Sequence, residues 1–288
     1  MRILVAGTGF SGSRILRTLA GAGHEVWGMN RSGVLSGWTP ERIFRGDVLD
    51  PDSLRTLREL PAMDLLISTL SGTGQQDPQA YRSVYVDGPG RIAEMLRWRD
   101  RSRIWMLGST GVYGVKDGSW VDEQSPAQPL HRNGEVQLAA EEALGKSFDE
   151  ISVLRLSGLY GPGRTRLIRQ ALRKRSFLKP EIWSNQIHVE DVAGLIGFLA
   201  GRELPPPSLL LVSDVRPALR REIFSWVREQ TACPEGCYDE DHPRRAGSDR
   251  GNKRVNSGRM QSLGYFLRYP TYREGLTPYL EAPSSPDL

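Results

Sequence analysis

The chain begins with MRILVAGTGFSGSRIL (residues 1–16), where an apolar run leads into a glycine-rich turn and then a helical pattern. RILVAG (2–7) is short and uniformly apolar, as a buried parallel strand is. Gly7, Gly9 and Gly12 follow with the spacing G-x-G-x-x-G. Between a strand and a helix, this spacing is typical of a turn that binds the pyrophosphate of a dinucleotide, although a generic glycine-rich turn is the alternative. The opening therefore predicts a dinucleotide-binding α/β fold.

Each residue of this turn has a distinct expected role. Gly7 permits the tight turn, Gly9 lets the pyrophosphate approach the backbone, and Gly12 lets helix and strand pack closely. Amide groups of Phe10 and Ser11, at the helix start, are expected to meet the phosphates.

The second strand, EVWGMN (25–30), ends without the carboxylate that would bind the ribose 2′-hydroxyl of NAD. Asn30, Arg31 and Ser32 occupy that position instead, and a guanidinium there suits the 2′-phosphate of NADP. We therefore predict NADP as the cofactor, with NADPH preferred over NADH. A solvated turn arginine is the alternative.

The third strand ends in RGDV (45–48), which places Asp47 and Val48 where they could contact the adenine. Asp47 could equally cap the next helix.

Strand and helix patterns alternate along the first half of the chain. This predicts an α/β fold, a Rossmann-type doubly wound parallel sheet with a small C-terminal substrate-side lobe. We expect an NAD(P)-binding core over residues 1–160. Residues 161–288 form mostly the lobe, with segments of about 186–214 returning to the core, so that the lobe is not an independent domain. Helices are expected at 50–60, 79–99 (broken at Pro89), 130–144, 186–201 and 219–231, and a strand at 208–214.

Composition excludes several function classes. The 288 residues carry 38 basic and 34 acidic side chains, a balance too mild to indicate a nucleic-acid partner, and the basic stretch 164–175 is expected to be a solvated helix face. Apolar runs fall well short of the ~20 residues that span a membrane, and no secretion signal is evident. We expect a cytoplasmic monomer or homodimer acting on a small molecule.

Cys233 and Cys237 are expected to be free thiols, because even with His242 nearby the ligands are too few for a metal site.

Hydroxyl side chains gather just beyond the fifth strand, in GSTGVYG (108–114). In open parallel sheets the ligand lies beyond the carboxyl ends of the strands. Ser109, Thr110 and Tyr113 are therefore candidate active-site residues, and a Ser/Thr/Gly turn with a packing tyrosine is the alternative.

Five motifs in order, GTGFSG, GDV, STGVYG, LRLSGLYGPG and IHVEDVA, make the chain resemble the short-chain dehydrogenase/reductase superfamily. The resemblance is to its extended or atypical branch of epimerase/dehydratase-like proteins and runs from residue 1 to about 280. It implies that Ser109 orients the substrate carbonyl or alcohol. It also implies a Tyr-x-x-x-Lys pair on the next helix, where the tyrosine transfers the proton and the lysine binds the nicotinamide ribose.

That pair is absent from the next helix, LHRNGEVQLAAEEAL (130–144). Asn133 occupies the position of the tyrosine and Gln137 that of the lysine. The rest of the family pattern is matched by Gly134, Leu138 and Glu141. Asn133 is also a candidate helix cap. Amides can hydrogen-bond a substrate or ribose but cannot transfer a proton. Loss of acid–base help typically costs ~10²–10⁴-fold in rate, so we look for a replacement.

Tyr113 is the favoured replacement, followed by His131 and Lys116. His131 and Thr110, with Tyr160 and Arg164 of LYGPGR (159–164), are candidate substrate contacts, and Arg164 would suit an anionic group.

Two residues of IHVEDVA are expected to be structural. His188 is expected to bond locally and Asp191 to order a helix start.

Three functions stay open. The favoured one is an NADP-dependent oxidoreductase or epimerase-like enzyme acting on a small carbonyl, alcohol or sugar-like substrate. The others are an NADP-binding redox-sensing or scaffold protein without turnover, and a non-redox isomerase or lyase on the same scaffold.

Overall fold

The computed structural model describes residues 1–72, 75–172, 181–231 and 251–280. Cys233, Cys237 and His242, on which the prediction of free thiols and no metal site depended, lie outside these residues.

The chain divides into two compact units. The first comprises Met1–Val112, His131–Arg155 and Val192–Leu210, and the second Tyr113–Leu130, Leu156–Asp191 and Leu211–Leu288. Residues 113–130, inside the predicted 1–160 core, thus group with the second unit, whereas 192–210 return to the first.

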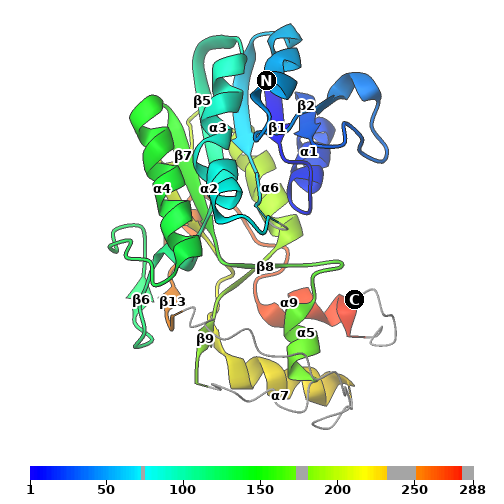
Figure 1. The fold of residues 1–288 in the computed structure, drawn as a ribbon. Helices are drawn as coiled ribbons and strands as arrows, with labels where there is room; N and C mark the ends of the chain where they lie inside the picture. The colour runs from blue at the N-terminus through cyan, green and yellow to red at the C-terminus, as the bar shows by residue number, and fades with distance from the viewer. Residues whose placement is uncertain (73–74, 173–180, 232–250, 281–288) are drawn as a thin grey trace. The chain divides into compact units, whose positions relative to one another are not determined.

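A seven-stranded sheet forms the centre of the first unit, with strand order β11-β7-β5-β4-β1-β2-β3 (Figure 1). The pairs β1–β2, β1–β4, β2–β3 and β4–β5 are all parallel. The order reverses between β1 and β4, and this is where open α/β sheets bind ligands. The strands are β1 (Arg2–Ala6), β2 (Glu25–Asn30), β3 (Ile43–Arg45), β4 (Met63–Ser68), β5 (Trp98–Ser109), β7 (Ile151–Leu156) and β11 (Leu209–Val212).

Helices cover the sheet in two groups. Helices α2 (Pro78–Val86), α3 (Gly88–Met95) and α4 (Arg132–Ser147) pack against one another, and the 3₁₀ helix Pro51–Glu59 packs against α3. Helix α1 (Gly12–Gly21) lies against α6 (Val189–Ala200), because a Cβ on Gly197 would meet Thr18 at 2.7 Å. This arrangement confirms the predicted Rossmann-type α/β fold.

Apolar side chains fill the space between the sheet and the α2, α3 and α4 group. Leu4, Trp27, Leu66, Ile104 and Leu144 belong to one buried cluster. Because parallel strands covered on both faces need apolar residues on both, their near-continuous apolar runs were readable from the sequence.

Short strands and helices build the second unit. Its strand pairs are β8 (Gly158–Tyr160) with β10 (Gln186–His188), β9 (Trp183–Ser184) with β12 (Ala218–Leu219), and β6 (Trp120–Val121) with β13 (Arg254–Val255). Its helices are α5 (Arg166–Ala171), α7 (Arg220–Thr231), α8 (Gly258–Ser262) and α9 (Tyr272–Leu276). Its core includes Tyr160, Ile168, Phe224, Tyr272 and Leu276.

The helix predicted at 50–60 is present as a 3₁₀ helix over Pro51–Glu59, with Asp50 at its start as expected. Two other local predictions were wrong. Residues 186–188 form strand β10 rather than helix, because Ile187 pairs with Leu159 of β8. Helix α4 starts one residue before Asn133, so its N-cap is His131.

Candidate functional site at the carboxyl ends of the strands

The glycine turn (residues 7–12) is held by β2 and by the end of β4. Gly7 adopts a φ of +94°, which favours glycine, and its N–H donates to the carbonyl of Met29 at 2.8 Å. The Thr69 hydroxyl donates to the carbonyl of Gly7, and the Thr69 N–H donates to Ala6 at 2.9 Å. The sequence analysis missed Thr69, although its place directly after a buried strand was a usable signal.

Gly12 and Gly9 meet very different surroundings. A Cβ on Gly12 would lie 2.0 Å from the Gly7 carbonyl oxygen and 2.7 Å from Thr69 Oγ1, so only glycine fits. A Cβ on Gly9 would meet no described residue within 4 Å. Helix α1 starts at Gly12, and the side chain of Ser11 does not cap it. The first turn of a helix carries N–H groups without intrahelical partners, so this open side suits an anion.

Asn30 organises the turn that follows β2. Its side-chain amide donates to Thr8 Oγ1 at 2.6 Å and to the Val34 carbonyl at 3.0 Å, while its oxygen accepts from the N–H of Gly33 and the hydroxyl of Ser32. Arg31 is exposed and has no hydrogen-bond or ion-pair partner among the described residues. The side-chain bonds of Asn30 thus shape the turn and leave the guanidinium of Arg31 to solvent.

Asp47 and Val48 are fixed locally. Asp47 Oδ1 accepts from the Leu49 N–H at 3.0 Å, and the N-cap of the next helix is Asp50, so the alternative role of Asp47 as that cap is wrong. The Val48 side chain is buried, and its carbonyl accepts from Arg91 at 2.7 Å. Contact of Asp47 and Val48 with an adenine stays a prediction.

Ser109 and Thr110 lie where β5 ends. Ser109 Oγ accepts from the N–H of Gly111 at 3.0 Å, which leaves its own O–H able to donate. Thr110 is buried and begins a short 3₁₀ helix, Thr110–Val112, that lies against α4.

The two amide side chains of helix α4, Asn133 and Gln137, differ in their exposure to solvent. Asn133 is exposed in the first turn. Gln137 is buried, with 9 % of its surface exposed, and its Oε1 has no hydrogen-bond partner among the described residues. A buried acceptor without a donor is costly, so Gln137 is suited to accept from a bound molecule. His131 precedes the helix and its side chain does not cap it.

Two of the candidate proton donors, Tyr113 and Lys116, belong to the second unit. Tyr113 is buried, with 1 % of its surface exposed, and pairs in an isolated bridge with Gln128. Lys116 is exposed.

Tyr160 is a core residue rather than a substrate contact. It is 3 % exposed, its ring packs edge-on against His188 at 5.1 Å, and its hydroxyl has no partner among the described residues. Desolvation raises the pKa of Tyr160 above its usual range. Arg164 is exposed, in a tight turn where its N–H donates to Gly161 at 2.8 Å.

His188 and Asp191 tie elements of the second unit together. His188 Nδ1 accepts from the Glu190 N–H at 3.2 Å, which is the local hydrogen bond expected of this histidine. Its Nε2 lies 2.9 Å from the Tyr279 hydroxyl. Asp191 accepts from the N–H groups of Arg268 at 2.6 Å and Tyr269 at 3.0 Å. Asp191 also lies in the first turn of α6, so its expected role in ordering that helix start stays a prediction, and its carboxylate in addition fixes a loop that is distant in sequence.

Two buried ionisable residues of the second unit escaped the sequence analysis. Burial raises the pKa of Asp214 well above its usual range, and its Oδ1 has no partner among the described residues. Burial also lowers the pKa of Lys253 to about 8.

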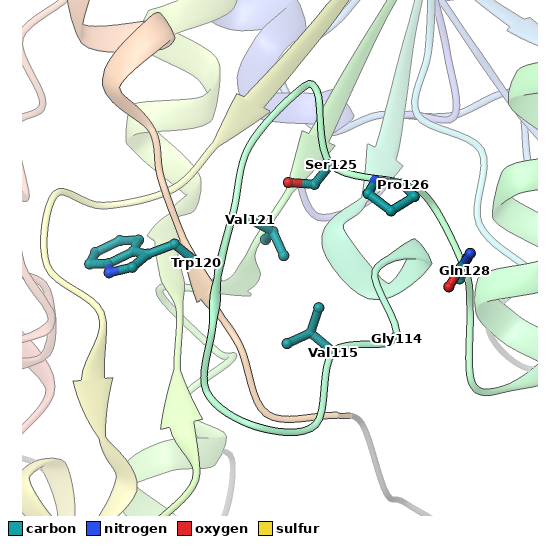
Figure 2. Close-up of a pocket in the computed structure, with 7 residues that line it drawn as sticks. All are labelled: Gly114, Val115, Trp120, Val121, Ser125, Pro126 and Gln128. Carbon is teal, nitrogen blue, oxygen red and sulfur yellow. The ribbon is translucent and has the colours of Figure 1, made fainter.

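A cavity of about 250 Å³ lies within residues 114–128 of the second unit. Figure 2 shows Val115 and Val121 facing its interior, whereas Trp120 points away. None of its lining side chains titrates, and its volume is below the ~300–1,000 Å³ of typical ligand pockets. It is therefore not a candidate for the chemistry. It is lined by Gly114, Val115, Trp120, Val121, Ser125, Pro126 and Gln128.

The first unit fits a dinucleotide on three observations. Among the described residues, the space beside Gly9 is open, the contacts of Gly12 exclude any side chain, and the buried acceptor of Gln137 has no donor. No described helix has the length and apolarity needed to cross a membrane. The described residues hold no cluster of three or more His, Cys, Asp or Glu side chains that could bind a metal.

Comparison with known proteins gives a consistent family. The model of the NAD dependent epimerase/dehydratase family matches residues 3–206. Protein YeeZ of Escherichia coli is 28% identical over 212 residues, which cover 69% of this chain and 72% of that protein.

Solved structures agree with this match over nearly the whole chain. A protein from Methylobacillus flagellatus, assigned to the NAD-dependent epimerase/dehydratases, has a TM-score of 0.77 at 29% identity and covers 98% of each chain. The Thermus thermophilus UDP-glucose 4-epimerase, solved in complex with NAD, has a TM-score of 0.76 at 20% identity over 98% of each chain, which supports the fold alone. The family match confirms the prediction of a nicotinamide dinucleotide, without distinguishing NADP from NAD.

Proposed function

The chain belongs to the NAD dependent epimerase/dehydratase family, and on that premise we propose that it is an NADP-dependent oxidoreductase or epimerase. Its substrate is a small carbonyl, alcohol or sugar-like compound. The observation that carries the proposal is the glycine turn, open beside Gly9, combined with the guanidinium of Arg31, which has no partner among the described residues and stands where NAD enzymes need a carboxylate.

Residues of the first unit would hold the cofactor. The open side of Gly9 and the start of α1 receive the pyrophosphate, and Arg31 receives the 2′-phosphate. Gln137 Oε1 accepts a hydrogen bond from a hydroxyl of the nicotinamide ribose, the contact that the family's lysine makes as a donor. When bound, the nicotinamide accepts or delivers a hydride.

Ser109 is the substrate-orienting residue of this proposal. Its oxygen already accepts from the Gly111 N–H, and its O–H can donate to a substrate oxygen. Such a donor stabilises charge that develops on that oxygen.

The proton must come from a residue other than Asn133 or Gln137. We retain Tyr113 as the first choice and His131 as the second, with Lys116 behind them. Activity of Tyr113→Phe and His131→Gln, compared with Asn133→Ala, tests the order. A donor variant should lose about 10²-fold or more in kcat, and Asn133→Ala much less. Full activity in Tyr113→Phe refutes the first choice, and unfolding midpoints show whether a loss reflects folding, because Tyr113 is buried.

The experiment that tests the function is a screen for NADPH consumption over aldehydes, ketones and nucleotide sugars. Turnover on any of them that is lost in Ser109→Ala supports the enzyme. Tight NADPH binding without turnover across the panel supports the second candidate, a redox-sensing or scaffold protein. One observation favours that candidate: the helix that carries the family's proton-transfer pair holds two amides, and Asn133 is exposed to solvent.

A further inference from the structure

A second arginine lies beside Arg31 at the carboxyl ends of the strands. Arg45 is the last residue of β3, and it is exposed. Like Arg31, it has no hydrogen-bond or ion-pair partner in the part of the chain that the structure describes. Two arginines without such a partner, one directly after β2 and one at the end of β3, give this part of the described chain a local excess of positive charge.

The strand register places Arg45 on the cofactor face of the sheet. In the parallel pair β2–β3, Asn30 is the partner of Arg45. Paired residues of neighbouring strands project to the same face, about 4.8 Å apart along the hydrogen-bonding direction. The Asn30 amide reaches Thr8 of the glycine turn at 2.6 Å, so this is the face on which the glycine turn lies.

The turn after β2 folds back onto Arg45. The Gly33 N–H donates to Asn30 Oδ1 at 2.7 Å, and Gly33 adopts a φ of +69°. A Cβ on Gly33 would lie 2.9 Å from the Cβ of Arg45. The turn that carries Arg31 therefore lies close to the base of the Arg45 side chain, so both arginines extend from the carboxyl ends of β2 and β3.

Two adjacent cations repel each other, and an anion between them relieves the repulsion. A phosphate monoester carries close to two negative charges at neutral pH and accepts paired N–H groups from arginine. A ribose diol can accept hydrogen bonds but is neutral, so it does not relieve this repulsion.

We propose that Arg45 is a second specificity-determining residue, which binds the 2′-phosphate of NADP together with Arg31. The inference rests on the proposed NADP preference and adds a residue to it. Arg31 follows β2 and reaches the phosphate from the turn, whereas Arg45 reaches it from β3.

Isothermal titration of the full chain with 2′,5′-ADP, 5′-ADP, NADPH and NADH tests the inference. We expect Arg45→Ala to weaken 2′,5′-ADP and NADPH about ten-fold, with 5′-ADP and NADH unchanged, because a charge-assisted phosphate contact is worth about one decade of affinity. Arg45→Lys should recover part of the loss, and Arg31→Ala/Arg45→Ala should bind NADPH and NADH equally. Arg58→Ala, which removes an exposed charge from the 3₁₀ helix Pro51–Glu59, is the matched control and should bind all four ligands as the wild type does.

The titrations distinguish a failure of the proposed role of Arg45 from a failure of the proposed NADP preference. If Arg31→Ala abolishes the preference and Arg45→Ala leaves it intact, the role of Arg45 is overturned while the NADP preference stands. If the wild type binds 2′,5′-ADP no better than 5′-ADP, the proposed NADP preference fails and the inference fails with it.

Discussion

Arg155 and Glu141 form a buried, three-contact ion pair between β7 and α4. Arg155 Nε lies 3.1 Å from both carboxylate oxygens of Glu141, and Nη2 lies 2.6 Å from Oε2. The two side chains are 7% and 8% exposed. A Cβ on Gly108 would lie 3.0 Å from Glu141 Oε1, so the pair presses against the strand residue that precedes Ser109. The glutamate of the family pattern thus supports β5, the strand that carries Ser109.

Breaking this pair should be costly. Arg155→Met leaves a buried carboxylate unpaired, and we expect it to lower the free energy of unfolding by about 3–5 kcal/mol in urea denaturation. The double variant Glu141→Leu/Arg155→Met should lose much less. Burial already raises the pKa of Glu141, so in Arg155→Met the loss should shrink at acid pH, where the carboxyl is protonated. Equal losses in the single and double variants would show that packing, not charge pairing, dominates.

Two glycines of α1 should respond to alanine in opposite directions. Gly12→Ala places a methyl 2.0 Å from the Gly7 carbonyl and should destabilise the protein by about 1–3 kcal/mol or more. Gly21→Ala meets nothing within 4 Å and should stabilise it by up to about 1 kcal/mol, through helix propensity. Thermal unfolding of both variants checks the contrast, and a harmless Gly12→Ala would contradict the packing described for the glycine turn.

Gly275 and Tyr160 should show energetic coupling. A Cβ on Gly275 would lie 1.7 Å from the Tyr160 hydroxyl, so Gly275→Ala should destabilise the protein despite its position in helix α9. Tyr160→Phe alone should be close to neutral, because it removes a buried hydroxyl that has no partner in the described parts of the chain. The double variant Tyr160→Phe/Gly275→Ala should lose about 0.5–3 kcal/mol less free energy of unfolding than the sum of the two single losses. Strict additivity in a double-mutant cycle is the result that argues against this contact.

Lys253 should make stability depend on pH. It is 7% exposed and burial lowers its pKa to about 8, from an ordinary value of 10.5. Below pH 8, Lys253 is charged in both the folded and the unfolded state, so its burial destabilises the folded state most there. Between about pH 8 and 10.5, the folded state loses the proton before the unfolded state does, so this destabilisation declines as the pH rises. Lys253→Met should therefore be more stable than the wild type at pH 7, by a margin that narrows toward pH 10. Lys146→Met removes an exposed ammonium and serves as the control; a margin that widens with pH would refute the account.

The first half of the fold was predictable from sequence because its signals are local. Strand β2 has the expected bounds of 25–30, since every one of its central residues is buried and apolar. The glycine turn was predictable because its spacing reflects backbone requirements that only glycine meets.

What escaped prediction depends on partners that are distant in sequence. Thr69 acts on Gly7 only because β4 neighbours β1, and β10 is a strand only because β8 lies beside it. Tyr160 looked available as a polar residue in a loop motif, yet it packs into the core of the second unit. The burial of Gln137 could not be read from a helix whose apolar residues fall on more than one face.

Gly9→Ala tests the central claim, a nicotinamide dinucleotide bound at the glycine turn, most directly. Because a methyl there meets no described residue within 4 Å, the variant should unfold at the wild-type midpoint. We predict that the wild type binds NADPH more tightly than NADH in a fluorescence titration, and that Gly9→Ala weakens NADPH by about ten-fold or more, since the methyl stands where the pyrophosphate approaches. Wild-type affinity in a fully folded Gly9→Ala variant, or no binding of either cofactor to the wild type, would contradict the account.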